Sequence, residues 1–176
     1  MKRPRKPLDS QRLEDLALHY VGRFATSRGK LAAYLNRKIR ERGWEGEGAA
    51  DVAALVQRYA DRGYVDDAAF AAMKGRDLTA RGYGPRRVGQ ALYAAGIDEG
   101  DRAEALDAAE TEKVSAALRF ARRRRMGPYA LQRIDDPADR QRALAAFARA
   151  GHDFTLAARI VDMDPGVEVD PDSLVD

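Results

Sequence analysis

The sequence of 176 residues has no cysteine, only two histidines and a single tryptophan. Without cysteine it can form no disulfide, thiolate metal site or cysteine nucleophile, and His19 and His152 are too few for a histidine-rich metal site. No apolar run approaches the roughly 20 residues that span a bilayer, and the basic N-terminus is followed by no apolar stretch typical of a secretory signal. These absences exclude most redox, zinc and cysteine chemistry, and we expect a cytoplasmic protein with no membrane partner.

Strand-forming residues are also scarce. The chain contains 33 alanines and 25 arginines against 6 lysines, and few valines, isoleucines and threonines. This composition favours helix over strand, so we predict an all-α fold. The excess of arginine has two explanations that composition does not separate. One is the codon bias of a GC-rich genome, and the other is a use of arginine for bidentate contacts to carboxylates or phosphates.

Charge is concentrated at the two ends. Residues 1–9 carry four basic residues and one acid, and residues 162–176 carry six acids and no base. Both ends combine proline and charge with low hydrophobicity, a composition typical of disorder. We predict a basic disordered tail over residues 1–9 and an acidic disordered tail over residues 163–176. The acidic tail either solubilises the chain or acts as an autoinhibitory mimic of nucleic acid or of an acidic partner.

Apolar residues at helical spacing predict a series of amphipathic helices. Leu13, Leu16 and Tyr20 share one helical face, and Leu31 and Leu35 share another. Several of these helices end in a glycine followed by a large apolar residue, the pattern of a Schellman cap. These pairs are Gly43-Trp44, Gly63-Tyr64, Gly82-Tyr83, Gly96-Ile97 and, less clearly, Gly151-His152. The pattern predicts that these glycines adopt left-handed backbone conformations.

The helix that follows Gly63 begins with two aspartates. Asp66 is placed to cap it, Asp67 adds a second acid at its positive end, and Phe70 and Met73 are expected to point inward. Because adjacent helical residues point about 100° apart, the two carboxylates are badly arranged for shared acid–base catalysis. Pro85 then occupies the first position of the next helix, after Gly84.

The helices repeat along the sequence. Pairs of apolar residues four positions apart recur just after a turn. We interpret each pair as part of the second helix of a three-helix unit. The pairs are Leu31 with Leu35, Val88 with Leu92, and Leu156 with Ile160. Small repeated units of this kind bury their faces on their neighbours. We predict three repeats, over residues 10–60, 61–109 and 110–162.

The ordered series of caps and turns in the central repeat resembles the signature of the RecX family, bacterial regulators of the RecA recombinase. The matching positions are Gly63, Tyr64, Asp66, Asp67, Phe70, Arg76, Gly82, Gly84, Pro85, Arg86, Arg87, Leu92, Gly96 and Ile97. The resemblance extends over about residues 10–162. It departs from the family pattern at His152, which stands where an aromatic residue, typically phenylalanine, is usual. We therefore expect His152 to pack less well.

The resemblance implies an elongated, curved protein of about nine helices in tandem three-helix repeats with helix-turn-helix-like units. It also implies the function. Members of the family bind the RecA filament on single-stranded DNA and suppress its ATPase, strand-exchange and coprotease activities, which serve recombination, DNA repair and the SOS response. On this basis the partner is the recombinase filament, and no cofactor or enzymatic activity is expected.

Arginines are the candidates for partner contact. Four are consecutive, namely Arg122, Arg123, Arg124 and Arg125, and because they span a helix circumference some must face solvent. Arg86 and Arg87 stand in the first turn of a helix, the end where the helix dipole disfavours cations. Their placement there indicates a role in contacting a partner. Arg76 is the third candidate position. These arginines could bind either an acidic protein groove or a phosphate backbone. Direct binding of single- or double-stranded DNA therefore stays an alternative. A single-chain repeat has no evident need to dimerise, so we expect a monomer.

Overall fold

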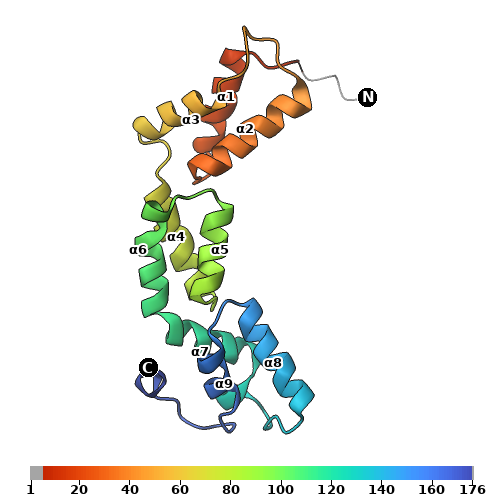
Figure 1. Ribbon diagram of the computed structural model, residues 1–176, viewed down its shortest axis with the longest axis vertical. Helices are drawn as coiled ribbons and strands as arrows, with labels where there is room; N and C mark the ends of the chain where they lie inside the picture. The colour runs from red at the N-terminus through yellow and green to blue at the C-terminus, as the bar shows by residue number, and fades with distance from the viewer. Residues whose placement is uncertain (1–5, 176) are drawn as a thin grey trace. The chain divides into compact units, whose positions relative to one another are not determined.

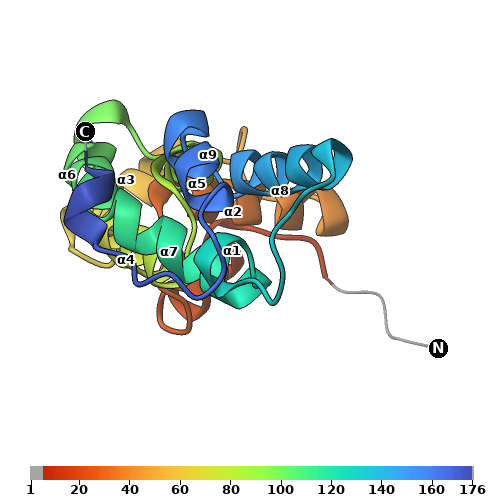
Figure 2. The ribbon, with the colours of Figure 1, turned by 90° about the horizontal axis from the view of Figure 1, so that it is seen from below.

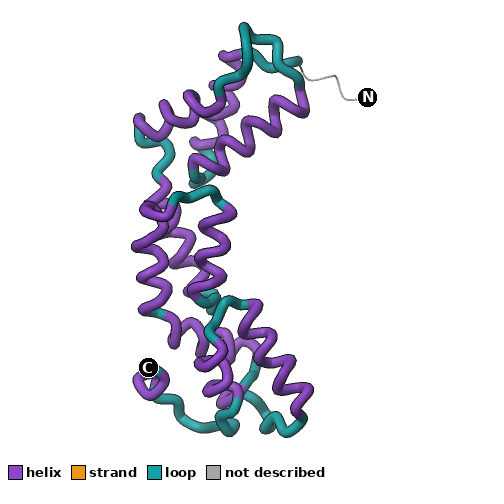
Figure 3. Tube along the Cα trace, in the orientation of Figure 1, coloured by secondary structure: helices purple, strands orange, loops and turns teal. Residues whose placement is uncertain are grey.

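The computed structural model describes residues 6–175, which fold into nine α-helices and two short 3-10 helices (Figures 1 and 3). The helices are α1 (Ser10–Val21), α2 (Arg28–Arg42), α3 (Val52–Asp61), α4 (Asp67–Ala80), α5 (Pro85–Ala94), α6 (Glu99–Thr111), α7 (Lys113–Arg124), η1 (Gly127–Tyr129), α8 (Pro137–Arg149), α9 (Phe154–Val161) and η2 (Pro171–Leu174). Over this range no strand forms apart from one isolated parallel bridge between Leu8 and Trp44. The all-α prediction is confirmed. None of the described helices is long and apolar enough to cross a membrane.

The chain divides into two compact units. The first contains the residues up to Phe70 together with Ala94–Asp101, and the second contains Ala71–Tyr93 together with the residues from Arg102 onward. The helices α4, α5 and α6 therefore contribute to both units. This division does not follow the three predicted repeats, whose boundaries stay a prediction.

The core of the first unit lies among α1, α2 and α3 (Figure 1). Leu13, Leu31, Leu35 and Leu55 are buried there, as the helical spacing indicates. Leu8 is also fully buried, and its backbone bonds to Gly43 and Glu45. The prediction of a disordered tail is thus wrong at Leu8, because one apolar side chain and two backbone hydrogen bonds hold this residue; residues 1–5 lie outside the described part of the chain.

In the second unit, α9 packs against both α7 and α8, and Figure 2 shows the three helices side by side. Phe120 of α7 and Phe147 of α8 meet edge to face, with ring centroids 4.8 Å apart. Ile160 and Leu156 of α9 are buried on the same core. In the third predicted repeat the matched helix is α9, which follows both α7 and α8, so it is the third helix of that segment and not the second.

The acidic C-terminal segment is ordered. Leu174 of η2 is 3% exposed and belongs to the core formed by α7, α8 and α9. Arg159 donates to the carbonyl oxygens of Ser173 and Leu174, and Arg140 pairs with Asp162 through two hydrogen bonds of 2.6 and 2.7 Å. The predicted disordered tail is therefore wrong for residues 163–175. Burial of Leu174 and hydrogen bonds from Arg159 hold this segment, and its composition alone did not indicate either.

The predicted helix caps are present. Gly63, Gly82 and Gly151 have positive φ angles. After each of them the next residue donates its backbone N–H to the carbonyl five residues earlier, which is the Schellman pattern. Gly96 also has a positive φ, and Ile97 after it is buried. The Asp66 side chain accepts from the Ala69 N–H, at 2.8 Å, and so caps α4.

Met73 in this region lies differently from the prediction, and Tyr64 and Asp67 make contacts that the sequence did not indicate. Met73 is 40% exposed and does not point inward, whereas Phe70 and Leu78 do. Tyr64 is more than half exposed and leans on Tyr59, with ring centroids 5.5 Å apart. Asp67 is buried and accepts the Arg28 N–H at the start of α2, at 2.8 Å. Burial raises the pKa of Asp67, and the hydrogen bond from Arg28 opposes that change.

Replacing Gly63 with valine should destabilise the chain by at least about 1 kcal/mol. The φ of Gly63 is 74°, a region that a β-branched side chain rarely adopts, and an added Cβ at this position would touch no other atom within 4 Å. The cost therefore comes from backbone strain alone. Thermal unfolding of the variant tests the cap, and an unchanged midpoint would contradict it.

Two turns cross at close range in the second unit. The N–H of Gly84 donates to the Ala150 carbonyl at 2.9 Å, and a Cβ added to Gly84 would overlap the carbonyl oxygen of Gly151. The first unit contains a similar crossing, where a Cβ on Gly29 would stand 2.7 Å from the Ala95 carbonyl oxygen. In each case glycine lets two backbone segments touch at the start of a helix.

Candidate functional site

The four predicted arginines lie at the C-terminal end of α7, and all four side chains are exposed. We refer to Arg122, Arg123, Arg124 and Arg125 as the α7 arginine cluster. Within residues 6–175, no carboxylate is paired with any of these guanidinium groups, whereas many other arginines are paired with acids. The cluster is therefore a surface of uncompensated positive charge in the second unit.

Aromatic rings hold several of these side chains in place. The guanidinium of Arg122 lies 4.9 Å from the ring centroid of Tyr129. Arg123 lies 5.8 Å from Tyr83 and 5.7 Å from Phe120, and it donates a hydrogen bond to the Arg81 carbonyl oxygen. Such cation–π contacts restrict the side chains while their N–H groups stay available. The arginines are thus pre-organised for a partner that carries carboxylates or phosphates.

Arg125 has an unusual backbone conformation. With a φ of 54° it is the one described residue other than glycine with positive φ, and it occupies the cap position after α7. The N–H of Arg125 bonds to Arg122 and that of Met126 to Ala121, so the cap is a Schellman motif with arginine in the usual place of glycine. An arginine there costs stability that glycine would not.

Replacing Arg125 with glycine should therefore stabilise the second unit by about 0.5–1 kcal/mol. The variant also removes one charge from the α7 arginine cluster. Urea unfolding measures the change in the free energy of unfolding, and a loss of stability would mean that the side chain contributes more than its backbone strain costs. An Arg125→Ala variant controls for the loss of the side chain without the relief of strain.

Arg86 and Arg87 lie at the start of α5, and both side chains are exposed. Arg86 pairs at 3.5 Å with Asp153, the residue that caps α9. Slight burial raises the pKa of Asp153, but the backbone N–H groups at the start of α9 and the charge of Arg86 outweigh that effect and lower it. The unfavourable placement of Arg86 at a helix N-terminus is therefore partly compensated within the protein. Arg87 has a weak hydrogen bond, of 3.5 Å, with Gln90.

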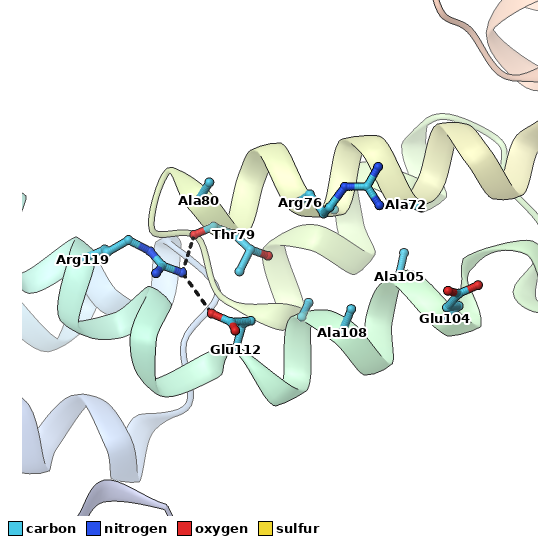
Figure 4. Close-up of a pocket in the computed structure, with 11 residues that line it drawn as sticks. Ala72, Arg76, Thr79, Ala80, Glu104, Ala105, Ala108, Glu112 and Arg119 are labelled. Carbon is cyan, nitrogen blue, oxygen red and sulfur yellow. Dashed lines mark hydrogen bonds and ion pairs between the residues drawn. The ribbon is translucent and has the colours of Figure 1, made fainter. Parts of the chain in front are cut away.

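Arg76 lies on the rim of a groove between α4 and α6, which Figure 4 shows from the side. The groove has a volume of about 480 Å³. Its floor consists of small residues, and Arg119 at one end donates to the Thr79 carbonyl oxygen at 3.3 Å and pairs with Glu112 at 3.5 Å. Neither this groove nor the position of Arg119 was predicted from the sequence. The alanine and glycine positions that line it were visible in the sequence but do not differ from those of any alanine-rich helix.

The predicted arginines thus lie in three settings of the second unit. Arg76 borders the groove, Arg86 and Arg87 border the turn before α9, and the α7 arginine cluster lies beside the end of α4, where Arg123 reaches the Arg81 carbonyl. The signature residues have structural roles. Gly63, Gly82 and Gly96 end helices, Pro85 starts α5, and Leu92 and Ile97 are buried.

His152 is better packed than expected. It is 1% exposed, its Nε2 lies 3.0 Å from the Gly82 carbonyl oxygen, and its ring contacts Phe120 and Phe147. Its Nδ1 has no hydrogen-bond partner. The imidazole thus fills the aromatic position and adds one hydrogen bond to the crossing of the two turns. Burial lowers the pKa of His152, and the bond to Gly82 opposes that change.

Stability should consequently fall as the pH drops below about 6.5, the pKa of histidine in an unfolded chain. Because the folded pKa is lowered, the unfolded state binds the proton first, and the loss approaches about 1.4 kcal/mol per pH unit until the folded imidazole titrates too. Urea unfolding at pH 7.5 and 5.5 measures this loss. A His152→Phe variant should remove it, and an equal loss in that variant would contradict the assignment.

The two adjacent aspartates are not arranged as a catalytic pair. Asp66 caps α4, whereas Asp67 turns away to the start of α2. Across residues 6–175, no three histidine, cysteine or acidic side chains gather as a metal site would require. The structure is an all-α chain whose second unit carries the exposed α7 arginine cluster.

Comparison with known proteins identifies the family. Residues 66–106 match the family model described as RecX, second three-helix domain. The chain is 37% identical to the regulatory protein RecX of Myxococcus xanthus, over 93% of this chain and 91% of that one. It is 31% identical to the protein of the same name from Agrobacterium fabrum, over 84% of this chain and 80% of the relative. The chain belongs to the RecX family of regulatory proteins, which are not enzymes.

Solved structures agree on the fold. A crystal structure of regulatory protein RecX covers 86% of this chain with a TM-score of 0.60 at 17% sequence identity, and the chain matches 70% of that structure. The RecX structure from Lactobacillus salivarius covers the same share with a TM-score of 0.58, also at 17% identity, and 93% of its own length is matched. At this identity the likeness establishes the helical fold alone.

Proposed function

We propose that this chain binds the filament that the RecA recombinase forms on single-stranded DNA and modulates it, mainly by inhibiting its ATPase, strand-exchange and coprotease activities. Membership of the RecX family supports the proposal, and the α7 arginine cluster is the observation that carries it. Its guanidinium groups are exposed, unpaired with acids and supported by Tyr83, Phe120 and Tyr129. In the cell this activity would serve recombination, DNA repair and the SOS response.

A protein partner fits this surface better than autonomous reading of bases. The rings of Tyr83, Phe120 and Tyr129 are covered by guanidinium groups and are themselves partly or fully buried. They therefore stabilise the arginines and leave no open aromatic face on which a base would stack, as single-strand binders usually provide. Arginine held in this way suits carboxylates on the surface of a filament.

Direct DNA binding is the second candidate, because guanidinium groups bind phosphates equally well. The two candidates differ in their response to salt. A chain that makes 6–10 phosphate contacts should lose roughly 10³–10⁵-fold in affinity for DNA between 50 and 200 mM salt. Binding to the recombinase filament should weaken less than binding to naked DNA if protein contacts dominate.

The proposal is tested by fluorescence anisotropy of the labelled chain, titrated with filaments assembled from the cognate recombinase and with the same DNA alone. We expect saturable binding to filaments at salt concentrations that abolish binding to DNA. Equal affinities for both would favour the DNA-binding candidate. Light scattering of the free chain tests the further prediction that it is a monomer.

A further inference from the structure

The groove between α4 and α6 is an open apolar depression in the second unit (Figure 4). The two helices face each other with small side chains, including Ala72 and Gly75 from α4 and Ala105 and Ala108 from α6. No large side chain of the chain itself fills the space. Its volume, about 480 Å³, lies within the range of roughly 300–1,000 Å³ that ligand sites occupy.

Thr79 offers a hydrogen-bonding side chain to a ligand in the groove. It lines the groove from α4 and is 7% exposed, and among the described residues its hydroxyl has no hydrogen-bond partner. Its backbone carbonyl, in contrast, is bonded to Arg119. The Thr79 hydroxyl oxygen is not among the fully buried unpaired side-chain atoms of the described residues, so a group that enters the groove can reach it. Figure 4 shows the Thr79 side chain between the two helices, where an inserted segment would reach it.

The charges on the rim restrict the kind of ligand. Arg76 on α4 is exposed and has no ion-pair partner in the described chain, and Glu104 stands on the α6 side. Glu112 lines the same groove near Arg119. With Glu112 paired with Arg119, the lining carries two acids and two bases, so it offers a nucleic-acid backbone no net positive charge. A carboxylate of the ligand is favoured beside Arg76 and disfavoured beside Glu104, so the ligand is oriented across the groove.

We propose that the groove receives one large apolar side chain from a segment of the partner protein, with an aspartate or glutamate of the same segment paired with Arg76. The segment also supplies a hydrogen-bonding group to the Thr79 hydroxyl. This inference rests on the proposed function, in which the partner is the recombinase filament. It adds a second contact area, separate in chemistry from the α7 arginine cluster.

The absence of cysteine from the sequence permits a direct test. An Ala108→Cys variant carries a single thiol in the groove, and an Ala103→Cys variant carries one on the same helix outside it. Each is labelled with a benzophenone cross-linker and irradiated with filaments. We expect an adduct with the recombinase from position 108 and little from position 103. Mass spectrometry should map it to a peptide with a large apolar residue near an acid.

Adducts of equal yield from both positions would overturn the inference. Adducts only between copies of this chain would overturn it as well, because they would assign the groove to self-association. A recombinase peptide without a nearby acidic residue would contradict the role of Arg76.

Two further variants separate the groove from the proposed function as a whole. Ala108→Phe fills the groove and Arg76→Glu reverses the charge on its rim, and each should weaken filament binding by about tenfold or more. The matched controls are Ala103→Phe on α6 and Arg149→Glu on α8, both at exposed positions, which should change affinity less than about twofold. Unchanged binding by both groove variants would overturn the groove alone. Failure of the wild-type chain to bind filaments at all would overturn the proposed function and this inference with it.

Discussion

Replacing Gly84 with alanine should destabilise the second unit by about 1–3 kcal/mol, the cost typical of forcing an extra methyl group into a packed site. The added Cβ would overlap the Gly151 carbonyl oxygen and crowd the His152 nitrogen, both of which are backbone atoms. Side-chain repacking cannot relieve such an overlap, so the two turns must separate. The hydrogen bond from Gly84 to Ala150 and the contact of His152 with Gly82 would be strained together.

The matched control is Gly89→Ala in the same helix. There the new Cβ would stand 3.4 Å from a Leu106 methyl group, an ordinary contact, and alanine is favoured over glycine inside a helix by roughly 0.5–1 kcal/mol. Gly89→Ala should therefore leave stability unchanged or raise it. Urea unfolding measures the free energy of unfolding of both variants. Equal values would mean that the close crossing of the turns leaves room for a side chain at Gly84.

Removing three arginines of the α7 arginine cluster should produce the largest functional loss. We expect an Arg122→Ala, Arg123→Ala, Arg124→Ala variant to bind the recombinase filament roughly 10–100-fold more weakly, because exposed, pre-organised arginines are frequent hot spots of interfaces. Arg125 is left in place so that the cap after α7 does not change. Anisotropy with labelled chain measures the affinity, and circular dichroism verifies that the fold is kept.

Two controls assign the cause of that loss. The same three positions changed to lysine keep the net charge but lose bidentate geometry and aromatic stacking, so affinity should be intermediate. Removing three arginines from α2, namely Arg37, Arg40 and Arg42, lowers the net charge equally in the first unit and should have a small effect. If the α2 variant weakens binding as much as the α7 variant, the attraction is one of overall charge and not of this surface.

Much of the fold could be predicted from the sequence because its helix ends use local chemistry. Gly63, Gly82 and Gly151 each precede a residue that completes the cap, and Asp66 caps α4 through its own side chain. These are interactions over a few residues, which spacing reveals. The burial of Leu31, Leu35, Val88 and Leu92 follows from the same helical periodicity.

The remainder depends on contacts between residues far apart in the chain. Leu8 and Leu174 lie in segments whose composition predicts disorder, yet both are buried against the helical cores, and Asp67 reaches a helix that begins 39 residues earlier. Arg125 forms a helix cap without the glycine that signals one. The groove between α4 and α6 exists because small residues of two helices meet without filling the space, which no local pattern indicates.

The most direct test of the central proposal is the single-strand-dependent ATPase of the cognate recombinase, measured with sub-stoichiometric amounts of this chain. We expect the wild-type chain to suppress the ATPase well below one copy per recombinase subunit. A variant of the α7 arginine cluster and an Arg86→Ala, Arg87→Ala variant, each shown to be folded, should locate the contact by the loss of suppression. An ATPase that stays unchanged at saturating amounts of the wild-type chain would contradict the proposal and favour direct DNA binding.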